Sequence, residues 1–357
     1  MTTAVPSPWQ RTRLRRSVCT GPGIRRVRRG RGFAYVDDEG ERMVDEEVLA
    51  RVHELVIPPA WEDVWICPYP GGHIQATGVD ERGRKQYLYH PKWRESRDRE
   101  KFEDMVAFAR GLPALREHVD ADLRRGDLSL EHVLAAATRL LDRGFFRIGS
   151  EDYAVTNETY GLATMRKSHV RLHNDRIVFD YPAKSRKRRV QSVVDPEVAE
   201  VIAALKRRRG GGPELLAWRR GRRWIDLRSP DINAYLKRVT GLDVSAKDFR
   251  TWGATVLAAV GLAVAAPNVH STTASKRAMS WTVKEVARYL GNTPAVARSS
   301  YIDPRVFDRF AEGYTIGPVL LELGDDVDTT AIQGPVEDAV LDLLEGDRSS
   351  ENVERVA

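Results

Sequence analysis

Five polar side chains between residues 147 and 301 are of types that suit chemistry at a phosphate group. Arg147 follows an apolar stretch, Lys184 lies at an expected β-turn, and Arg250 lies near the start of an expected helix. Asn292 lies in the helix-breaking segment Leu-Gly-Asn-Thr-Pro, and Tyr301 follows it by nine residues. Guanidinium groups present planar, bidentate donors and stay charged. An ammonium group can also give up a proton, so a lysine can act as a general acid.

Each of these side chains, taken alone, has an ordinary structural interpretation. Arg147 could be a surface or capping arginine, and Lys184 belongs to a run of five bases between 184 and 189 that could be a solvated loop. Arg250 could pair with an acid, Asn292 could cap a helix, and Tyr301 is one of eleven tyrosines. Only their order along the chain, within these contexts, favours a functional interpretation.

The distribution of charge predicts a polyanionic partner. The net charge of the 357 residues is +6. Residues 321–357 carry eleven acidic and two basic side chains, a net charge of −9, which leaves +15 on residues 1–320. Nucleic acid is the commonest partner of so basic a body, and a solvated basic surface is the structural alternative.

No pattern in the sequence indicates a bound metal, a nucleotide-binding loop or a membrane span. Cys19 and Cys67 lack metal-ligand spacing, and neither a carboxylate cluster spaced as a two-metal site nor a Gly-x-x-x-x-Gly-Lys-Ser/Thr loop is present. The apolar runs fall short of the ~20 residues that a membrane span needs, and no apolar segment follows the N-terminal arginines as in a signal peptide. We therefore expect no metal, no small-molecule cofactor and no membrane partner, and a cytoplasmic, nucleoid-associated location, since two unpaired cysteines fit a reducing compartment.

The first 95 residues divide into a basic segment and a small β-rich domain. Residues 1–31 are rich in Arg and Gly and are expected to be flexible. Within 32–95, the segments 33–36 and 41–44 predict a hairpin, and the apolar spacing over 45–56 predicts a helix. Proline after residue 57 ends that helix, because proline cannot continue it. Further strands are expected near 64–67, 73–77 and 85–89.

A mainly helical catalytic domain is predicted over residues 96–323. The apolar spacing predicts helices over 97–110, 115–124, 129–142, 196–208, 231–239, 247–265 and 282–290, and at 306–311. Residues 169–194 interrupt this pattern with three β-type segments, which predict a three-stranded meander. Residues 324–357 are expected to be an acidic tail, mostly solvated apart from an apolar patch at 336–344. The predicted fold class is α+β: a small β-rich N-terminal domain and a larger, mainly helical domain that contains the meander.

In this order and these contexts, the polar segments resemble the catalytic domain of type IB DNA topoisomerases, most closely the small poxvirus and bacterial forms. The likeness covers roughly residues 32–317. Arg-Ile-Gly, Lys-Asp-Phe-Arg-Thr-Trp-Gly and Gly-Asn-Thr-Pro are specific in combination, although each alone is weak. Ile57-Pro-Pro-Ala-Trp-Glu-Asp-Val-Trp-Ile and Val79-Asp-Glu-Arg-Gly-Arg-Lys-Gln-Tyr-Leu-Tyr-His are similar to the β-domain of the family.

The resemblance implies an isomerase that relaxes double-stranded DNA as a monomer, without ATP or metal. Arg147, Lys184, Arg250 and Tyr301 would fill the Arg–Lys–Arg–Tyr positions of the family. There the tyrosine attacks, keeps the 3′-phosphate and expels a 5′-hydroxyl, and lysine is the best general acid for the 5′-oxygen. The residues implied to contact DNA are Gln86, Tyr87, Tyr89, Tyr153 and Lys247.

One position departs from the usual pattern of the family. The fourth catalytic position is usually histidine, and here it is Asn292. The NH₂ group of an asparagine side chain can donate the same hydrogen bond to a non-bridging phosphate oxygen without titrating. This predicts that position 292 acts through electrostatics and not through proton transfer, so the substitution bears on the rate more than on the mechanism.

Two other functions stay open on sequence alone. A tyrosine recombinase would share the Arg–Lys–Arg–Tyr chemistry, but recombinases usually carry His-x-x-Arg where this chain has Lys-Asp-Phe-Arg, and a helical N-terminal domain where this chain is β-rich. A DNA-binding protein without activity is favoured only by the missing histidine at position 292. The acidic tail is expected to be dispensable as a solvated terminus, or mildly autoinhibitory because it would repel DNA.

Overall fold

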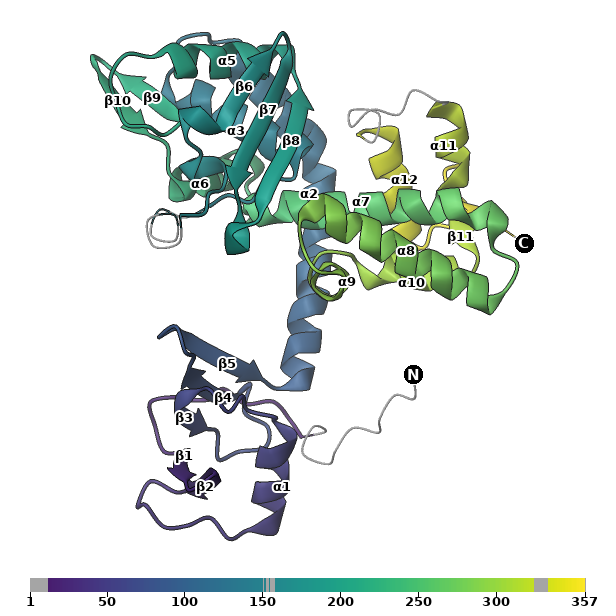
Figure 1. Cartoon of the computed structure of the whole chain (residues 1–357). Helices are drawn as coiled ribbons and strands as arrows, with labels where there is room; N and C mark the ends of the chain where they lie inside the picture. Colours follow the sequence, from purple (N-terminus) through teal and green to yellow (C-terminus); the bar gives the residue numbers. More distant parts are fainter. Residues whose placement is uncertain (1–11, 150, 152–153, 155–157, 324–332, 357) are drawn as a thin grey trace. The chain divides into compact units, whose positions relative to one another are not determined.

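The computed structural model describes residues 12–149, 151, 154, 158–323 and 333–356 (Figure 1). The chain divides into two compact units, Met1–Lys101 and Phe102–Ala357. Helix α2 (Pro91–Leu123) begins in the first unit, and its residues from Phe102 onward belong to the second. The fold class is the α+β arrangement predicted from the sequence, with a small β-sheet unit and a larger, mainly helical unit.

The N-terminal unit is an antiparallel sheet with one short helix. The strands are β1 (Ile24–Arg29), β2 (Gly32–Val36), β3 (Glu62–Ile66), β4 (Ile74–Val79) and β5 (Lys85–Tyr89), in the spatial order β2-β1-β3-β4-β5. Helix α1 (Glu46–Glu54) begins at Asp45, whose side chain accepts hydrogen bonds from two backbone N–H groups of the first turn. Buried Arg51 joins α1 to the sheet, because its guanidinium donates to Oε1 of Gln75 at 2.7 Å.

The N-terminal sheet differs from the expectation at two points. Ile24–Arg29 is a strand that pairs with β2 and β3, so the expectation of a flexible segment up to residue 31 is wrong there. β2 therefore forms its hairpin with β1, and residues 41–44 contribute only an isolated bridge between Val36 and Arg42. The arginine-rich composition obscured this strand. Arg26, for example, packs over the ring of Phe33 at 4.2 Å and donates to the backbone of residues 57, 58 and 61.

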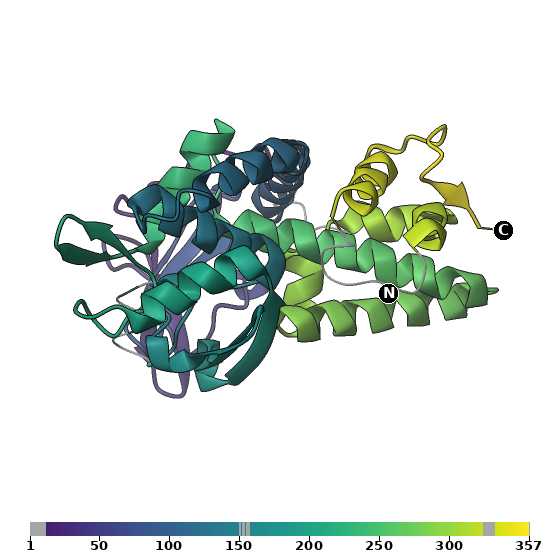
Figure 2. The same ribbon diagram turned by 90° about the horizontal axis from the view of Figure 1, so that it is seen from above.

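The larger unit contains the meander and most of the helices (Figures 1 and 2). Besides most of α2, its described α-helices are α3 (Leu130–Gly144), α5 (Pro196–Arg207), α6 (Ser229–Thr240), α7 (Ala246–Ala265), α8 (Thr272–Leu290), α9 (Pro294–Ser300), α10 (Pro304–Ala311), α11 (Gly317–Leu323) and α12 (Pro335–Glu345). The meander is β6 (Val170–His173), β7 (Arg176–Pro182) and β8 (Arg188–Val194), paired antiparallel in sequence order. A small hairpin is formed by β9 (Ala217–Arg220) with β10 (Arg223–Asp226), and a second two-stranded antiparallel sheet by β11 (Tyr314–Thr315) with β12 (Glu354–Arg355), which are far apart in sequence.

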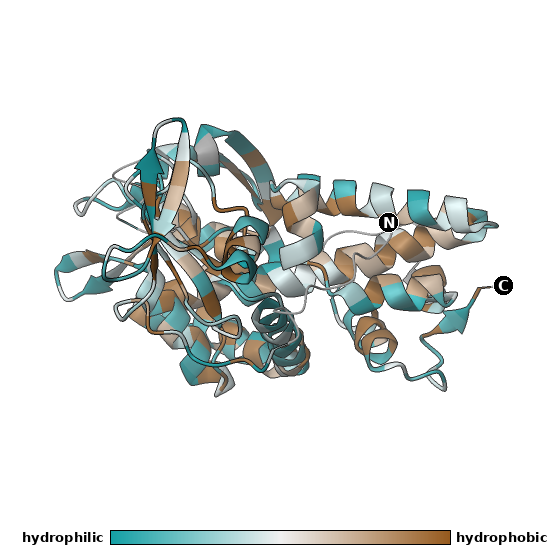
Figure 3. Cartoon of the chain, turned by 90° about the horizontal axis from the view of Figure 1, so that it is seen from below, coloured by the Kyte–Doolittle hydropathy of each residue, from teal (hydrophilic) through white to brown (hydrophobic). Residues whose placement is uncertain are grey.

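Helix α7 is the central helix of this unit. It packs against α3, α6, α8, α10, α11 and α12. By length and composition alone, Ala246–Asn268 is apolar enough to cross a membrane, but 67% of its apolar window is buried inside the fold. Figure 3 shows hydrophobic and hydrophilic positions side by side along the helices of this unit, as expected for helices with one buried face. The core position of α7 accounts for its hydrophobicity.

Two predicted helices are a single helix. Residues 97–110 and 115–124 both belong to α2, which continues through Pro113. Buried Phe102, Met105, Phe108, Leu112, Leu115 and Val119 keep the helical spacing on both sides of that proline. Tertiary packing of this continuous apolar stripe overrides the local break.

The acidic C-terminal stretch is not a mainly solvated tail. Helix α12 buries Val336, Ala339, Val340, Leu343 and Leu344 in the main core. The expectation of a mostly solvated terminus is therefore wrong for residues 335–345. The apolar patch seen in the sequence is one face of an amphipathic helix, and its acidic residues lie on or beside the other face.

Candidate active site

Arg250 is held on α7 by two backbone carbonyl groups. It is 3% exposed, and its guanidinium donates to the carbonyl oxygens of Phe145 and Leu290, the latter at 2.9 Å. Burial, reinforced by the positive charge of Arg147, lowers the pKa of Arg250 to about 10. The side chain therefore stays charged at neutral pH, in a fixed orientation between α3 and α8.

Arg147 lies in the segment that follows α3. The helix ends at Phe145, which takes a left-handed φ of 52°, and Gly149 has a φ of +82° that favours glycine. Nη2 of Arg147 donates to the carbonyl oxygen of Gly291 at 2.9 Å and to Oδ1 of Asn292. This arginine is thus fixed against the turn after α8.

The amide of Asn292 is oriented by Arg147. Helix α8 ends at Gly291 in a left-handed conformation (φ 62°), and the backbone N–H of Asn292 donates to the carbonyl oxygen of Ala287 at 2.9 Å. Because Oδ1 accepts from Arg147, Nδ2 is left as the donor. It is buried and finds no hydrogen-bond acceptor within the described part of the chain. Such a donor costs free energy until an acceptor satisfies it.

Tyr301 follows α9 and lies half-buried beside Arg250. Cζ of Arg250 is 5.3 Å from the centroid of the tyrosine ring. Burial alone would raise the pKa of Tyr301, but the positive charges of Arg250, Arg147 and Lys247 more than offset it, so the pKa lies below its ordinary value. Two of these cations, Arg250 and Lys247, lie within the first turns of α7.

Lys184 lies between β7 and β8 and is exposed. It lines a cavity of ≈ 310 Å³ together with Arg147 and Asn292. The other cationic side chains that line this cavity are Lys187, Arg188, Arg189 and Arg288. A strongly cationic cavity of this kind suits an anionic ligand such as a phosphodiester. Across the residues that the structure describes, no group of three or more His, Cys, Asp or Glu side chains is placed to hold a metal ion.

The predicted catalytic residues therefore occupy one region of the larger unit. Hydrogen bonds join Arg147 to Asn292 and to the end of α8, and Arg250 joins the same helix end to the segment that contains Arg147. Tyr301 lies beside Arg250, and Lys184 shares the cavity with Arg147 and Asn292. Lys247, predicted to contact DNA, lies close enough for its charge to affect Tyr301.

The residues predicted to contact DNA in the N-terminal unit lie on the edge strand β5. Tyr87 and Tyr89 are 42% and 40% exposed, and their rings stack with centroids 6.1 Å apart. Gln86 points to the other face of the strand, where Nε2 donates to Oδ2 of Asp80 at 2.8 Å. The two tyrosines thus form an exposed aromatic pair that does not include Gln86. Tyr153 lies outside the described residues.

Sequence reasoning did not single out Arg189. It lies in the basic run that contains Lys184, and composition alone cannot separate a buried arginine from its solvated neighbours. The alternation of β8 is the signal that was available, because Arg188 and Arg189 must point to opposite faces of the strand. Arg188 is exposed and pairs with Asp180 at 2.8 Å, while Arg189 is half-buried beside the end of α8.

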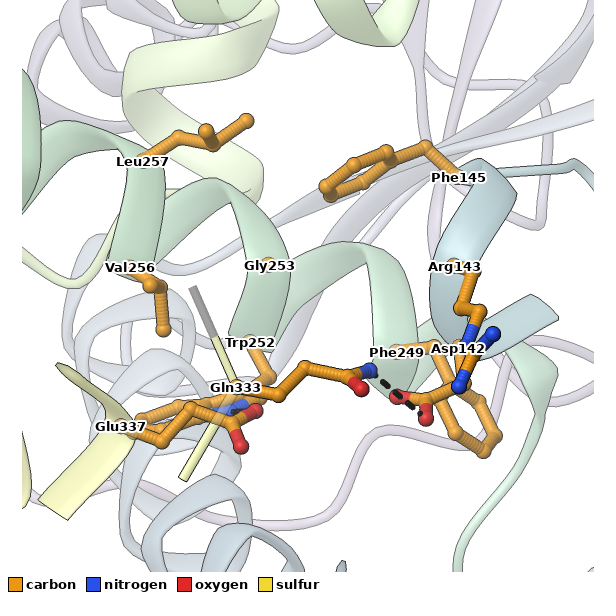
Figure 4. Close-up of a pocket in the computed structure, with 10 residues that line it drawn as sticks. All are labelled: Asp142, Arg143, Phe145, Phe249, Trp252, Gly253, Val256, Leu257, Gln333 and Glu337. Carbon is orange, nitrogen blue, oxygen red and sulfur yellow. Dashed lines mark hydrogen bonds between the residues drawn. The ribbon is translucent and has the colours of Figure 1, made fainter. Parts of the chain in front are cut away.

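Helix α12 is attached to the elements that carry the arginines (Figure 4). Oε1 of Glu337 accepts a 2.7 Å hydrogen bond from Nε1 of Trp252 on α7. Arg116 of α2 pairs with both Glu337 and Asp142 of α3, at 2.6 and 2.9 Å. Gln333, just before α12, also donates to Asp142 at 3.0 Å. The C-terminal helix is thus linked to α2, to α3, which precedes Arg147, and to α7, which carries Arg250.

Two family models match the chain. The family described as eukaryotic DNA topoisomerase I, catalytic core, matches residues 90–312. The family described as bacterial DNA topoisomerase IB, N-terminal domain, matches residues 32–80. The first match covers more than half of the chain and includes Arg147, Lys184, Arg250, Asn292 and Tyr301. The chain belongs to the type IB DNA topoisomerase family.

The chain is also similar to DNA topoisomerases of several viruses. The chain is 27% identical over 293 residues to the DNA topoisomerase 1B of Acanthamoeba polyphaga mimivirus, a match that covers 78% of this chain and 85% of the relative. It is 20% identical over 232 residues to the DNA topoisomerase 1B of vaccinia virus (strain Copenhagen), covering 65% and 71%. It is 21% identical over 303 residues to the DNA topoisomerase 1 of rabbit fibroma virus (strain Kasza), covering 78% and 89%.

Proposed function

We propose that this DNA topoisomerase relaxes supercoiled double-stranded DNA through a 3′-phosphotyrosyl ester at Tyr301, without ATP or metal. The phenolic oxygen forms a bond to phosphorus while the bond from phosphorus to the 5′-oxygen breaks. The phenol loses its proton to solvent, and the 5′-oxygen gains one from Lys184. Rotation of the free 5′ end relaxes the duplex, and attack by the 5′-hydroxyl then releases Tyr301. The ester conserves the bond energy, so resealing requires no ATP.

The observation that carries this proposal is that two of the buried donors without an acceptor in the described residues lie at this site. They are Nε of Arg250, beside Tyr301, and Nδ2 of Asn292. Negative charge grows on the non-bridging oxygens as a phosphodiester is attacked, and prepositioned donors stabilise such a transition state. Two oxygens of the reacting phosphate would satisfy both donors and recover the cost of their burial.

The electrostatic surroundings of Tyr301 support its role as the nucleophile. A phenol with an ordinary pKa near 10 is almost fully protonated at neutral pH. The neighbouring cations lower the pKa of Tyr301, which eases proton loss as the bond to phosphorus forms. The same cations stabilise the negative charge that moves from the phenol to the phosphoryl group.

Lys184 is proposed as the general acid. Arginine holds its proton too tightly for that role, whereas an ammonium group can transfer one. Lys184 is exposed on the rim of the cationic cavity that Arg147 and Asn292 also line. A proton donated there would reach the leaving 5′-oxygen of a bound strand.

The binding of the substrate is proposed to rest mainly on charge. Residues 1–320 carry +15, which favours phosphate contacts without sequence reading and with strong salt dependence. Tyr87 and Tyr89 offer exposed aromatic faces on an edge strand. One site suffices for this reaction, so we propose a monomer, and we propose that it acts on the nucleoid in the cytoplasm.

The test is formation of a covalent adduct on a labelled duplex from which the short downstream fragment, which carries the new 5′-hydroxyl, dissociates after cleavage. Wild type should give a denaturant-resistant adduct through the 3′-phosphate, in EDTA and without ATP. Tyr301→Phe should give none while it still binds the duplex. Tyr289→Phe is the matched control, since the ring of this exposed tyrosine meets Phe145 edge to face and the variant would lose only the hydroxyl. An adduct formed by Tyr301→Phe would overturn the proposal.

A further inference from the structure

The C-terminal end of α8 collects three guanidinium groups. Three arginines donate to three successive carbonyl oxygens: Arg189 to Tyr289 at 2.7 Å, Arg250 to Leu290 at 2.9 Å, and Arg147 to Gly291 at 2.9 Å. The last carbonyl groups of a helix lack partners within the helix and form the negative end of its dipole. The helix end therefore offsets the repulsion among three like charges and sets the spacing between them.

Arg189 differs from the other two arginines because it also ties α8 to α3 through a side chain. Its Nε donates to Oε1 of Gln191, two residues along β8. Nε2 of Gln191 in turn donates to the carbonyl oxygen of Gly144 at 2.9 Å, at the end of α3. The segment with Arg147 begins directly after Gly144. Arg189 thus bonds directly to the backbone at the end of α8, and it is linked through Gln191 to the backbone at the end of α3.

Arg189 also packs against the turn that carries Asn292. A Cβ atom at position 291 would lie 2.7 Å from Nη1 of Arg189, so the guanidinium approaches this backbone as closely as glycine allows. Gly291 has a φ of +62°, which itself favours glycine. The neighbouring Arg188 also lines the cavity, but its guanidinium pairs with Asp180.

We propose that Arg189 is a positioning residue of the active site: it holds the Tyr289–Asn292 turn so that the Asn292 amide keeps its orientation toward the reacting phosphate. The inference rests on the proposed function of the site. Arg189 acts through the turn and through Arg147, not by contact with the reacting atoms. A basic residue that only attracts DNA would instead act on affinity.

The first test separates cleavage from binding. In single-turnover cleavage, Arg189→Gln should lower the rate constant roughly 10- to 100-fold, since small displacements of positioned groups have effects of this order. Its DNA affinity should change no more than that of Arg171→Gln. Arg171 is the matched control: it is exposed on β6, bonds to Asp180, and lies outside the lining of the cavity. A loss of affinity alone, with a normal rate constant, would overturn the proposal.

The second test asks whether Arg189 works through Asn292. If it does, Arg189→Gln should slow cleavage much less in an Asn292→Ala background than in wild type, because the oriented amide is already gone. If Arg189→Gln slows cleavage by the same factor in both backgrounds, Arg189 acts independently of Asn292, and the positioning account is rejected.

A third measurement does not depend on activity, so it also decides the case if no variant cleaves DNA. Gly291→Ala should lower the urea midpoint of unfolding, since the new Cβ must displace Arg189. Arg189→Met removes that obstacle and leaves only the backbone strain, so Gly291→Ala should then lower the midpoint by clearly less. Equal losses in both backgrounds would show that Arg189 does not hold the turn. Absence of cleavage by wild type would reject the proposed function and leave this result to stand alone.

Discussion

At the scale of single residues, Asn292 offers a hydrogen-bond donor without a titratable proton. Arg147 accepts no hydrogen bonds, so it orients the amide by donating to Oδ1 and leaving Nδ2 as the free donor. The donor is thereby fixed before substrate binds, which is the condition under which a donor contributes most to a transition state.

We predict that Asn292→Ala lowers the single-turnover cleavage rate about 10²-fold, because one prepositioned donor is lost. DNA affinity should change little. Asn292→His is the matched variant: it restores a donor and should recover most of the rate, but with an added dependence on pH near the pKa of histidine. A rate for Asn292→Ala equal to wild type would remove position 292 from the mechanism.

The lowered pKa of Tyr301 predicts the pH dependence of cleavage. The phenolate fraction increases with pH, so the rate should rise with pH and level off earlier than for an ordinary phenol. Lys247→Gln removes one of the cations that lower this pKa, so its profile should shift to higher pH. Lys276→Gln, which removes the same charge elsewhere, should leave the profile in place. Superimposable profiles for wild type and Lys247→Gln would contradict this account of Tyr301.

The acid role of Lys184 predicts a dependence on the leaving group. Lys184→Ala should cleave an ordinary phosphodiester slowly, by a factor on the order of 10²–10⁴. A duplex with sulfur at the 5′-bridging position should be cleaved at a rate near that of wild type, because a thiolate leaves without a proton. Equal slowing on both substrates would exclude Lys184 as the acid.

At the scale of elements, the site depends on helix ends and on the helices that hold them. The carbonyl groups at the end of α8 accept hydrogen bonds from Arg147, Arg189 and Arg250. Arg250 itself belongs to α7, the central helix of the larger unit. Helix α12 packs against α7, and the two helices are joined by the hydrogen bond from Trp252 to Glu337. Deleting residues 325–357 therefore removes part of the core.

We predict that Leu343→Ala lowers the free energy of unfolding by about 2–5 kcal/mol, because the side chain is 2% exposed in the core. Leu321→Ala is the matched control on α11. Its side chain is 83% exposed, and its effect should stay within about 0.5 kcal/mol. Urea titration measures both. A Leu343→Ala chain as stable as wild type would mean that α12 does not belong to the core.

Much of this architecture could be predicted from the sequence, because it follows from local periodicity. The meander at 170–194 shows as strand-type segments separated by turns, and α3 (Leu130–Gly144) matches the helix expected over 129–142. The five polar segments were identified by their order and context, which folding preserves. In each of these cases the deciding signal lies within a few residues.

The remaining features depend on contacts between distant segments. Strand β1 could not be predicted from its arginine-rich composition, because the contacts that show its place in the sheet come from distant residues. Arg26, for example, packs over Phe33 and donates to the backbone carbonyl of Trp61. Helix α12 is acidic, and only its buried face shows that it is part of the core. Arg189 is distinguished from Arg188 by a carbonyl group one hundred residues away in sequence.

At the scale of the whole molecule, basic and acidic regions are separated along the chain. Residues 1–320 carry the positive charge that suits a duplex, while residues 321–357 carry a net charge of −9. Several of those acids are engaged within the larger unit: Glu337 with Arg116, and Glu345 with Arg110. The C-terminal acids thus contribute to the fold as well as to the overall charge.

The measurement that tests the central claim most directly is relaxation of negatively supercoiled plasmid in EDTA and without ATP, with Tyr301→Phe alongside. The account predicts relaxation by wild type and none by Tyr301→Phe at equal DNA binding. Relaxation that requires added metal or ATP, or that persists in Tyr301→Phe, would contradict it. Strand exchange at defined sites without plasmid relaxation would assign the chain to recombination instead.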